Sequence, residues 1–116
     1  MTRIELLYFD GCPSWRRAWN DLGTALVETG VVAEVRLRDV MAMSEEERRG
    51  FAGSPTIRVD GIDLEGYDGP GILACRRYGE NDWRGWPSRD LLRDRLRAAA
   101  PAASVERRTD AGGSPT

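Results

Sequence analysis

A buried strand that passes directly into a helix is the feature that most constrains the fold of this chain. Residues 4–9 form a largely apolar run whose side chains alternate between two faces, which is typical of a strand inside an α/β sheet. Asp10-Gly11 ends the run, and Pro13 suits the first turn of a helix, where its missing N–H costs nothing. Apolar side chains then recur at helical spacing as far as Leu26. The chain therefore starts as a strand–helix unit.

Two further elements follow this unit. Residues 31–40 alternate between apolar and charged side chains, which predicts a strand with one wet face at a sheet edge. We expect this strand to lie parallel to the first, with a right-handed crossover. Ser44 and Glu47 form a capping-box pattern, which predicts a short helix over residues 45–50.

The second half of the domain reads as a hairpin and a final helix. Residues 56–60 and 62–65 are two short strands joined at Asp60-Gly61, a strong hairpin signal. Residues 89–99 have the spacing of an amphipathic helix. The order βαβ-α-ββα predicts an α/β fold, with a mixed four-stranded sheet and helices on both faces.

The length of 116 residues fits a single domain. We assign residues 1–100 to this domain and treat the glycine-rich segment 66–87 as an insertion between the hairpin and the last helix. Residues 101–116 are polar and rich in small side chains, which predicts a disordered tail.

Composition excludes several classes of function. With a net charge of −2, the chain lacks the excess of basic residues that nucleic-acid binding requires, so we expect no nucleic-acid partner. No apolar run approaches the ~20 residues of a membrane span, and the N-terminal residues lack a signal-peptide pattern, so we expect a cytoplasmic protein without membrane contact. The chain has no His and no Lys, which excludes Ser-His-Asp and Cys-His catalysis, imidazole zinc ligands and Schiff-base chemistry. We expect no cofactor and no metal.

The two cysteines, Cys12 and Cys75, are the main candidates for chemistry. Cys12 lies between the first strand and the first helix, where free backbone N–H groups and the helix dipole favour thiolate. Its pKa should therefore fall below the ~8.5 of a free cysteine, as in reactive cysteines. The alternative is that Cys12 is a small buried hydrophobic residue near a turn.

Two motifs together resemble a known superfamily. Tyr8-Phe9-Asp10-Gly11-Cys12-Pro13-Ser14-Trp15 opens a helix, and Gly53-Ser54-Pro55-Thr56-Ile57 opens a strand. With the element order over residues 3–99, this pattern resembles the thioredoxin-like superfamily. More narrowly, it is similar to small bacterial thioredoxin-like proteins that are often labelled alkylmercury lyase-like.

The resemblance implies a site around Cys12. It implies that Cys12 is the nucleophile and that Pro55 is preceded by a cis peptide bond and packs against the reactive sulfur. It also implies substrate-binding roles for Pro13, Trp15, Ser54, Pro55 and Thr56. Trp15 has a second interpretation, since its helical spacing from Trp19 is also typical of core packing.

One departure from the superfamily pattern bears on the mechanism. A thioredoxin has a second cysteine three residues after the first, and this chain has Trp15 there. Cys12 could then act alone on a low-molecular-weight thiol or a client protein thiol, or Cys75 could resolve its mixed disulfide. The alternative places Cys75 on a short buried helix beside Ile72 and Leu73.

Three functions follow from these residues. The first is a thiol-dependent oxidoreductase that uses Cys12, with Cys75 as a resolving thiol. The second is soft-metal or organomercurial chemistry, since two thiolates capture soft ions well. The third is a non-enzymatic thioredoxin-like binding module. The substrate, the electron donor and the oligomeric state are left open by the sequence.

Overall fold

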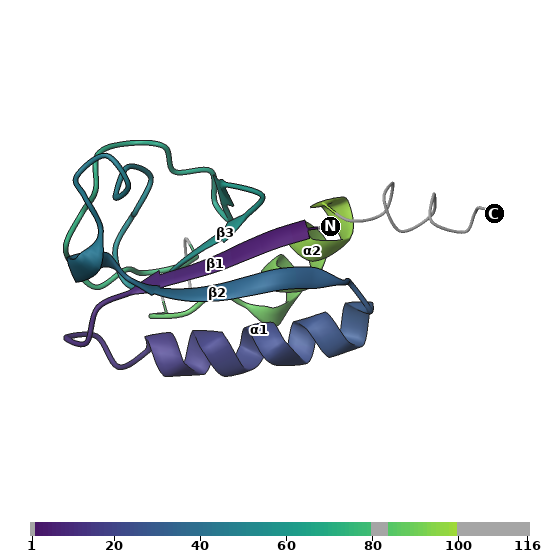
Figure 1. Cartoon of the computed structure of the whole chain (residues 1–116). Helices are drawn as coiled ribbons and strands as arrows, with labels where there is room; N and C mark the ends of the chain where they lie inside the picture. Colours follow the sequence, from purple (N-terminus) through teal and green to yellow (C-terminus); the bar gives the residue numbers. More distant parts are fainter. Residues whose placement is uncertain (1, 80–83, 100–116) are drawn as a thin grey trace.

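The computed structural model describes residues 2–79 and 84–99, which form an α/β fold around one mixed sheet. The strands lie in the order β2-β1-β3-β4, and β1 pairs in parallel with β2 and antiparallel with β3 (Figure 1). The elements are β1 (Thr2–Tyr8), α1 (Trp15–Thr29), β2 (Ala33–Asp39), a 3-10 turn η1 (Val40–Ala42), β3 (Thr56–Val59), β4 (Ile62–Asp63) and α2 (Arg89–Ala99). The mixed four-stranded sheet and the edge position of β2 are confirmed, while the tail predicted at 101–116 lies outside the described residues.

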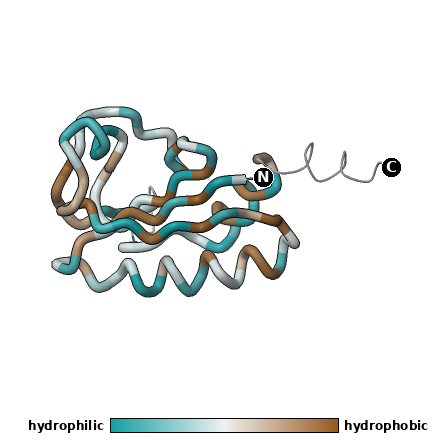
Figure 2. Tube along the Cα trace, viewed as in Figure 1, coloured by the Kyte–Doolittle hydropathy of each residue, from teal (hydrophilic) through white to brown (hydrophobic). Residues whose placement is uncertain are grey.

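One face of the sheet carries the main hydrophobic core. Alternating side chains of β1 turn Ile4 and Leu6 toward this face, and Figure 2 shows the alternation of hydrophobic and hydrophilic residues along β1 and β2. Both α-helices cover this face, and they also contact each other. Burying one such leucine or isoleucine contributes about 1.5–3 kcal/mol. The helical residues at the centre of this core are Ala18, Leu22, Ala25, Leu92 and Leu96.

The other face is covered by the short 3-10 element η1 and an irregular segment instead of an α-helix. Leu7 of β1 packs there with Val40, Met43 and Phe51. The helix predicted over residues 45–50 is therefore wrong, and so is the expectation of α-helices on both faces. Ser44 and Glu47 do form the reciprocal capping bonds, but the chain continues as turns to Gly50, which has a positive φ of 85°. Six residues are too few to hold a helix without packing, and the turns bury Phe51 instead.

The predicted hairpin places the Pro55 turn beside the end of β1. Asp60 and Gly61 both have positive φ values, 52° and 84°, as a two-residue turn between β3 and β4 requires. β3 then runs antiparallel to β1 with Thr56 opposite Leu7. As a result, the residues before β3 lie next to the segment that leads from β1 to Cys12.

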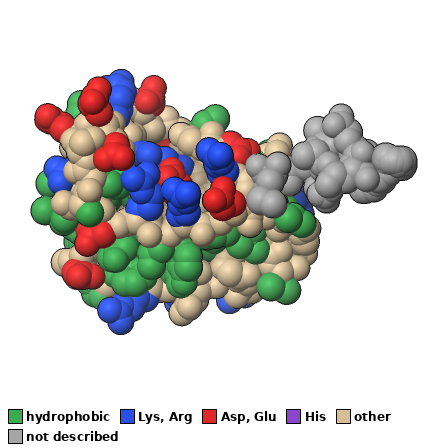
Figure 3. All heavy atoms as spheres, in the orientation of Figure 1, with side chains coloured by type: hydrophobic (Ala, Val, Ile, Leu, Met, Phe, Trp, Pro, Cys, Tyr) green, Lys and Arg blue, Asp and Glu red, His purple; other side chains and the backbone are tan. Residues whose placement is uncertain are grey.

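Charged side chains occupy the part of the second sheet face that the irregular segment leaves open. Arg38 donates to Glu5 at 2.9 Å, and Figure 3 shows basic and acidic side chains over the strands with hydrophobic side chains nearer α1. Positive and negative groups alternate here, so the face is not a one-signed patch. No helix among the described residues is long and apolar enough to cross a membrane.

Candidate functional site

Cys12, which lies between β1 and α1, forms a disulfide with Cys75, which lies in the segment between β4 and α2. The cysteines are 63 positions apart in the chain, and their Cα atoms are 5.8 Å apart. Cys12 is buried, with 1% of its surface exposed, whereas Cys75 is an exposed residue. The alternative that buries Cys75 on a short helix is wrong, because residues 71–79 contain no helix and Ile72 and Leu73 are about half exposed.

Cys12 lies in the turn between β1 and the start of α1. Ser14 is the N-cap residue, its side chain makes no capping hydrogen bond, and no acidic residue lies in the first helical turn. The positive end of the helix dipole is therefore not offset by a carboxylate of the first turn. A sulfur at this position gains stability as the thiolate. Pro13, which follows Cys12, is exposed.

Trp15 and Trp19 both pack against the main core from α1, and both are partly buried. The Trp15 ring lies against Tyr8, with 4.4 Å between the ring centroids. Arg16 is exposed, and its guanidinium carbon lies 5.1 Å from the Trp15 ring centroid. Trp15 therefore contributes to the core, and its predicted role toward a substrate stays a prediction.

The Ser54–Pro55 peptide bond is cis, as the resemblance implied. Ser54, Pro55 and Thr56 are all buried. Ser54 is bonded through its backbone to the segment around Cys75: its N–H donates to Ala74 O at 2.8 Å, and the N–H of Arg76 donates to Ser54 O at 3.0 Å. Residues 74–76 thus occupy the backbone of Ser54, one of the residues for which the resemblance implies substrate binding.

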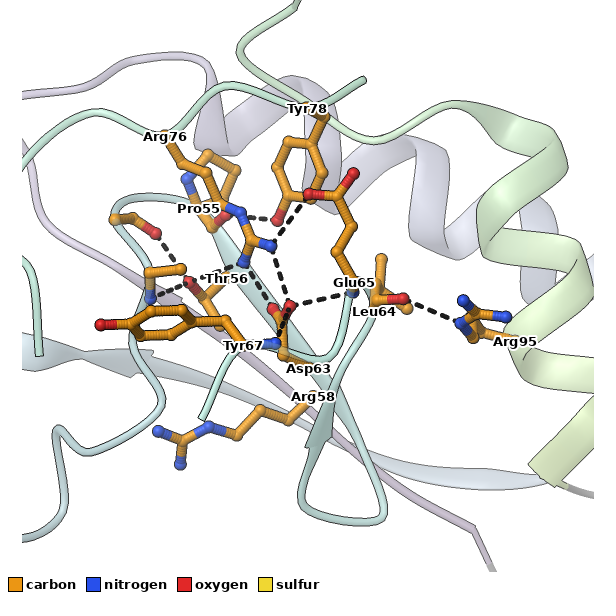
Figure 4. Close-up of polar contacts among 12 residues, drawn as sticks. Pro55, Thr56, Arg58, Asp63, Leu64, Glu65, Tyr67, Arg76, Tyr78 and Arg95 are labelled. Atoms are coloured by element: carbon orange, nitrogen blue, oxygen red, sulfur yellow. Dashed lines mark hydrogen bonds and ion pairs between the residues drawn. The ribbon is translucent and has the colours of Figure 1, made fainter. Parts of the chain in front are cut away.

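The side chain of Arg76 holds the Cys75 segment from the interior. Its Nη2 donates to Asp63 Oδ2 at 2.8 Å and to Glu65 Oε1 at 3.2 Å, and its Nη1 donates to Asp63 Oδ1 (Figure 4). Both Arg76 and Asp63 are buried. Burial by itself lowers the pKa of Arg76, but the hydrogen bonds and charge of Asp63 outweigh it and raise the pKa above its ordinary value. Arg76 is therefore a fixed cation.

Tyr78 also holds the segment that contains Cys75, through contacts on the C-terminal side of Arg76. Its hydroxyl donates to the carbonyl oxygen of Pro55 at 2.6 Å, and its ring lies 4.3 Å from the guanidinium carbon of Arg76 (Figure 4). Burial raises the pKa of the Tyr78 phenol well above its ordinary value. The position of Cys75 is thus set by backbone bonds before it and by buried side chains after it.

Sequence reasoning missed Asp63, Arg76 and Tyr78 as supports of the site. The guanidinium of Arg76 pairs with Asp63 and Glu65. In the strand predicted over 62–65, adjacent residues such as Asp63 and Leu64 point to opposite faces, so the sequence pattern does not indicate that Asp63 is buried with a partner. Nothing local identified that partner, which lies 13 positions away.

A shallow hollow lies beside the disulfide on its exposed side. Cys75 contributes to its wall together with Ala52, Glu65, Gly66, Tyr67, Arg76 and Arg77. We call this the Cys75 hollow. Within residues 2–79 and 84–99, no three His, Cys, Asp or Glu side chains are grouped to hold a metal ion.

Comparison with protein-family models, with curated proteins and with solved structures finds no match for this chain.

Proposed function

We propose that this protein is a thioredoxin-like thiol–disulfide oxidoreductase whose redox pair is Cys12 and Cys75. The observation that carries the proposal is the disulfide between them, which joins the start of α1 to an exposed residue. In the exchange, two external thiols reduce the disulfide: the external pair leaves as a disulfide, and both cysteines become thiols.

The surroundings of the pair support this proposal in two ways. The helix dipole of α1 stabilises the Cys12 thiolate, which makes Cys12 a good leaving group when the disulfide is reduced. Ser54 of the cis-proline turn forms a backbone bridge with Cys75, and the order of the elements within the mixed sheet is compatible with a thioredoxin-like fold. The resolving cysteine is distant in sequence, in place of the nearby one of a thioredoxin.

The substrates we propose are low-molecular-weight thiols or the thiols of client proteins. We place the reaction in the cytoplasm, where disulfides are usually transient and catalytic. An exposed Cys75 gives such partners direct access to one end of the disulfide.

Reduction of insulin by dithiothreitol tests the proposal. The wild-type protein is expected to accelerate the reaction, and Cys12→Ser and Cys75→Ser are each expected to return it to the uncatalysed rate, because each leaves a mixed disulfide unresolved. Circular dichroism of both variants controls for loss of fold. A wild-type protein no faster than dithiothreitol alone would exclude the oxidoreductase, and full activity of Cys75→Ser would exclude the two-cysteine mechanism.

The same contact between the sulfurs favours a second candidate, capture of a soft metal ion by the reduced pair. Two thiolates held together form a two-coordinate site for an ion such as Hg²⁺. The reduced protein is then expected to retain one Hg²⁺ per chain against competing glutathione, measured by native mass spectrometry. Equal retention by Cys75→Ser would remove this candidate.

A further inference from the structure

We infer that an external thiol attacks the sulfur of Cys75, so that the mixed disulfide forms on Cys75 and Cys12 is the internal leaving and resolving thiol. This inference rests on the proposed function and assigns the two cysteines separate roles within it. It reverses the roles that the resemblance implied, in which Cys12 meets the substrate.

Access to the two sulfurs is the first argument. A thiolate exchanges with a disulfide by reaching one of its sulfur atoms, so the exposed sulfur reacts first. Cys12 is 1% exposed, while Cys75 is exposed and lines the Cys75 hollow. Cys12 does not line this hollow, so a partner thiol that enters it meets Cys75.

The occupied backbone edge is the second argument. An extended substrate would reach Cys12 by pairing with the backbone of Ser54. That backbone already accepts from Arg76 and donates to Ala74, so this route is filled by the chain itself. Ser54 and both of its neighbours are buried in this state.

Leaving-group stability is the third argument. Exchange is faster when the expelled thiolate is the more stable one. Attack on Cys75 expels the Cys12 thiolate at the positive end of α1, where no first-turn acid opposes it. Attack on Cys12 would instead expel Cys75, which lies in the irregular segment 71–79 and does not itself precede a helix.

The resulting steps balance in both directions. In reduction, an external thiolate bonds to Cys75 Sγ, the Cys12–Cys75 bond breaks, and the electron pair leaves on Cys12. A second external thiolate then attacks the external sulfur and frees Cys75. In oxidation, the Cys75 thiolate attacks an external disulfide and expels one thiolate, after which Cys12 attacks Cys75 Sγ and expels the other. In the disulfide form, Arg76 and Tyr78 hold the Cys75 segment beside Cys12.

Trapping the first intermediate of the wild-type protein tests the assignment. The oxidised protein is mixed briefly with reduced glutathione and quenched with N-ethylmaleimide, which caps the free cysteine. Trypsin then separates the cysteines, because cleavage at arginine leaves Cys12 in residues 4–16 and Cys75 in residues 59–76. Mass spectrometry of the two peptides shows which cysteine carries glutathione and which carries the maleimide.

Glutathione is expected on the Cys75 peptide in about tenfold excess or more, with maleimide on the Cys12 peptide, because access decides which sulfur is attacked. Glutathione on Cys12, or equal amounts on both, would overturn the inference and leave the proposed function intact. A disulfide that glutathione reduces only after the protein is unfolded in urea would overturn both.

A second measurement uses the reduced protein and a limiting amount of iodoacetamide at about pH 9, where free thiols are largely ionised. Alkylation is expected mainly on the Cys75 peptide, because access then dominates over pKa. Preferential alkylation of Cys12 would contradict the inference.

Discussion

Arg76 donates to both carboxylate oxygens of Asp63, and it does so from the position immediately after Cys75. The backbone of the same residue donates to Ser54 O, so one residue joins the hairpin, the cis-proline turn and the redox pair. This arrangement makes the geometry of the disulfide depend on an ion pair in the interior of the protein.

Removing the carboxylate should therefore destabilise the fold. Asp63→Ala leaves the Arg76 guanidinium buried with only the more exposed Glu65 as an anionic partner, and breaking such a pair from one side costs about 3–5 kcal/mol. Urea denaturation measures the loss. The matched control is Asp68→Ala, since the Arg49–Asp68 pair is largely exposed and should contribute about 0–1 kcal/mol. Equal losses in the two variants would show that the buried pair has no special role.

Gly53 tests the contact between the cis-proline turn and residues 74–76. Its φ is 106°, and a Cβ there would lie 2.8 Å from Ala74 O, so Gly53→Ala should destabilise by about 1–3 kcal/mol and speed reduction of the disulfide by glutathione. Gly23→Ala is the opposite case, because Gly23 lies within α1 with open space around its Cβ position. That variant should gain up to about 1 kcal/mol. A neutral Gly53→Ala would argue against tight packing at this contact.

Reduction of the disulfide should lower the stability of the fold, by an amount that grows with the logarithm of the loop length. In the chain-entropy model, opening a loop of 63 residues removes about 4 kcal/mol. Urea midpoints with and without a phosphine reductant measure the difference. Cys75→Ser is the control, because the reductant has no bond to break in it. A reductant effect of the same size in that variant would contradict the prediction.

Tyr78 should make the protein sensitive to alkaline pH. Burial keeps the phenol protonated in the folded state, whereas the unfolded chain loses that proton near pH ~10. The stability contributed by the neutral phenol is complete below pH ~10 and falls as the pH rises beyond it, because the unfolded state then binds fewer protons. Unfolding free energies at pH ~9 and ~11 measure this decline, which should be smaller in Tyr78→Phe. Ultraviolet absorbance reports the ionisation of the tyrosines. A folded protein in which every tyrosine ionises near pH ~10 would contradict the predicted burial effect on Tyr78.

Much of the fold was predictable because its signals are local. The alternation along residues 4–9, the helical spacing after Pro13 and the turn at Asp60-Gly61 each specify an element within a few residues. The order of these elements then fixes the parallel pairing of β1 with β2. Cys12 could be placed at the start of α1 for the same reason.

The remaining features depend on long-range contacts that local patterns do not contain. The capping pair Ser44–Glu47 formed as predicted, yet the helix did not, because Phe51 is buried against Leu7 of β1. The contact between Cys12 and Cys75 was left open because the position of Cys75 depends on Arg76 and its buried partner Asp63. A charged pair of this kind leaves no periodic signature in the sequence.

The reduction potential of the Cys12–Cys75 pair tests the central claim most directly. The fraction of oxidised protein is measured across glutathione and dithiothreitol buffers, with the cysteines alkylated at each potential and counted by mass spectrometry. An oxidoreductase is expected to show one two-electron transition between about −120 and −270 mV, the range of thiol–disulfide oxidoreductases. A midpoint below about −300 mV would contradict the account, because disulfides of that stability are structural.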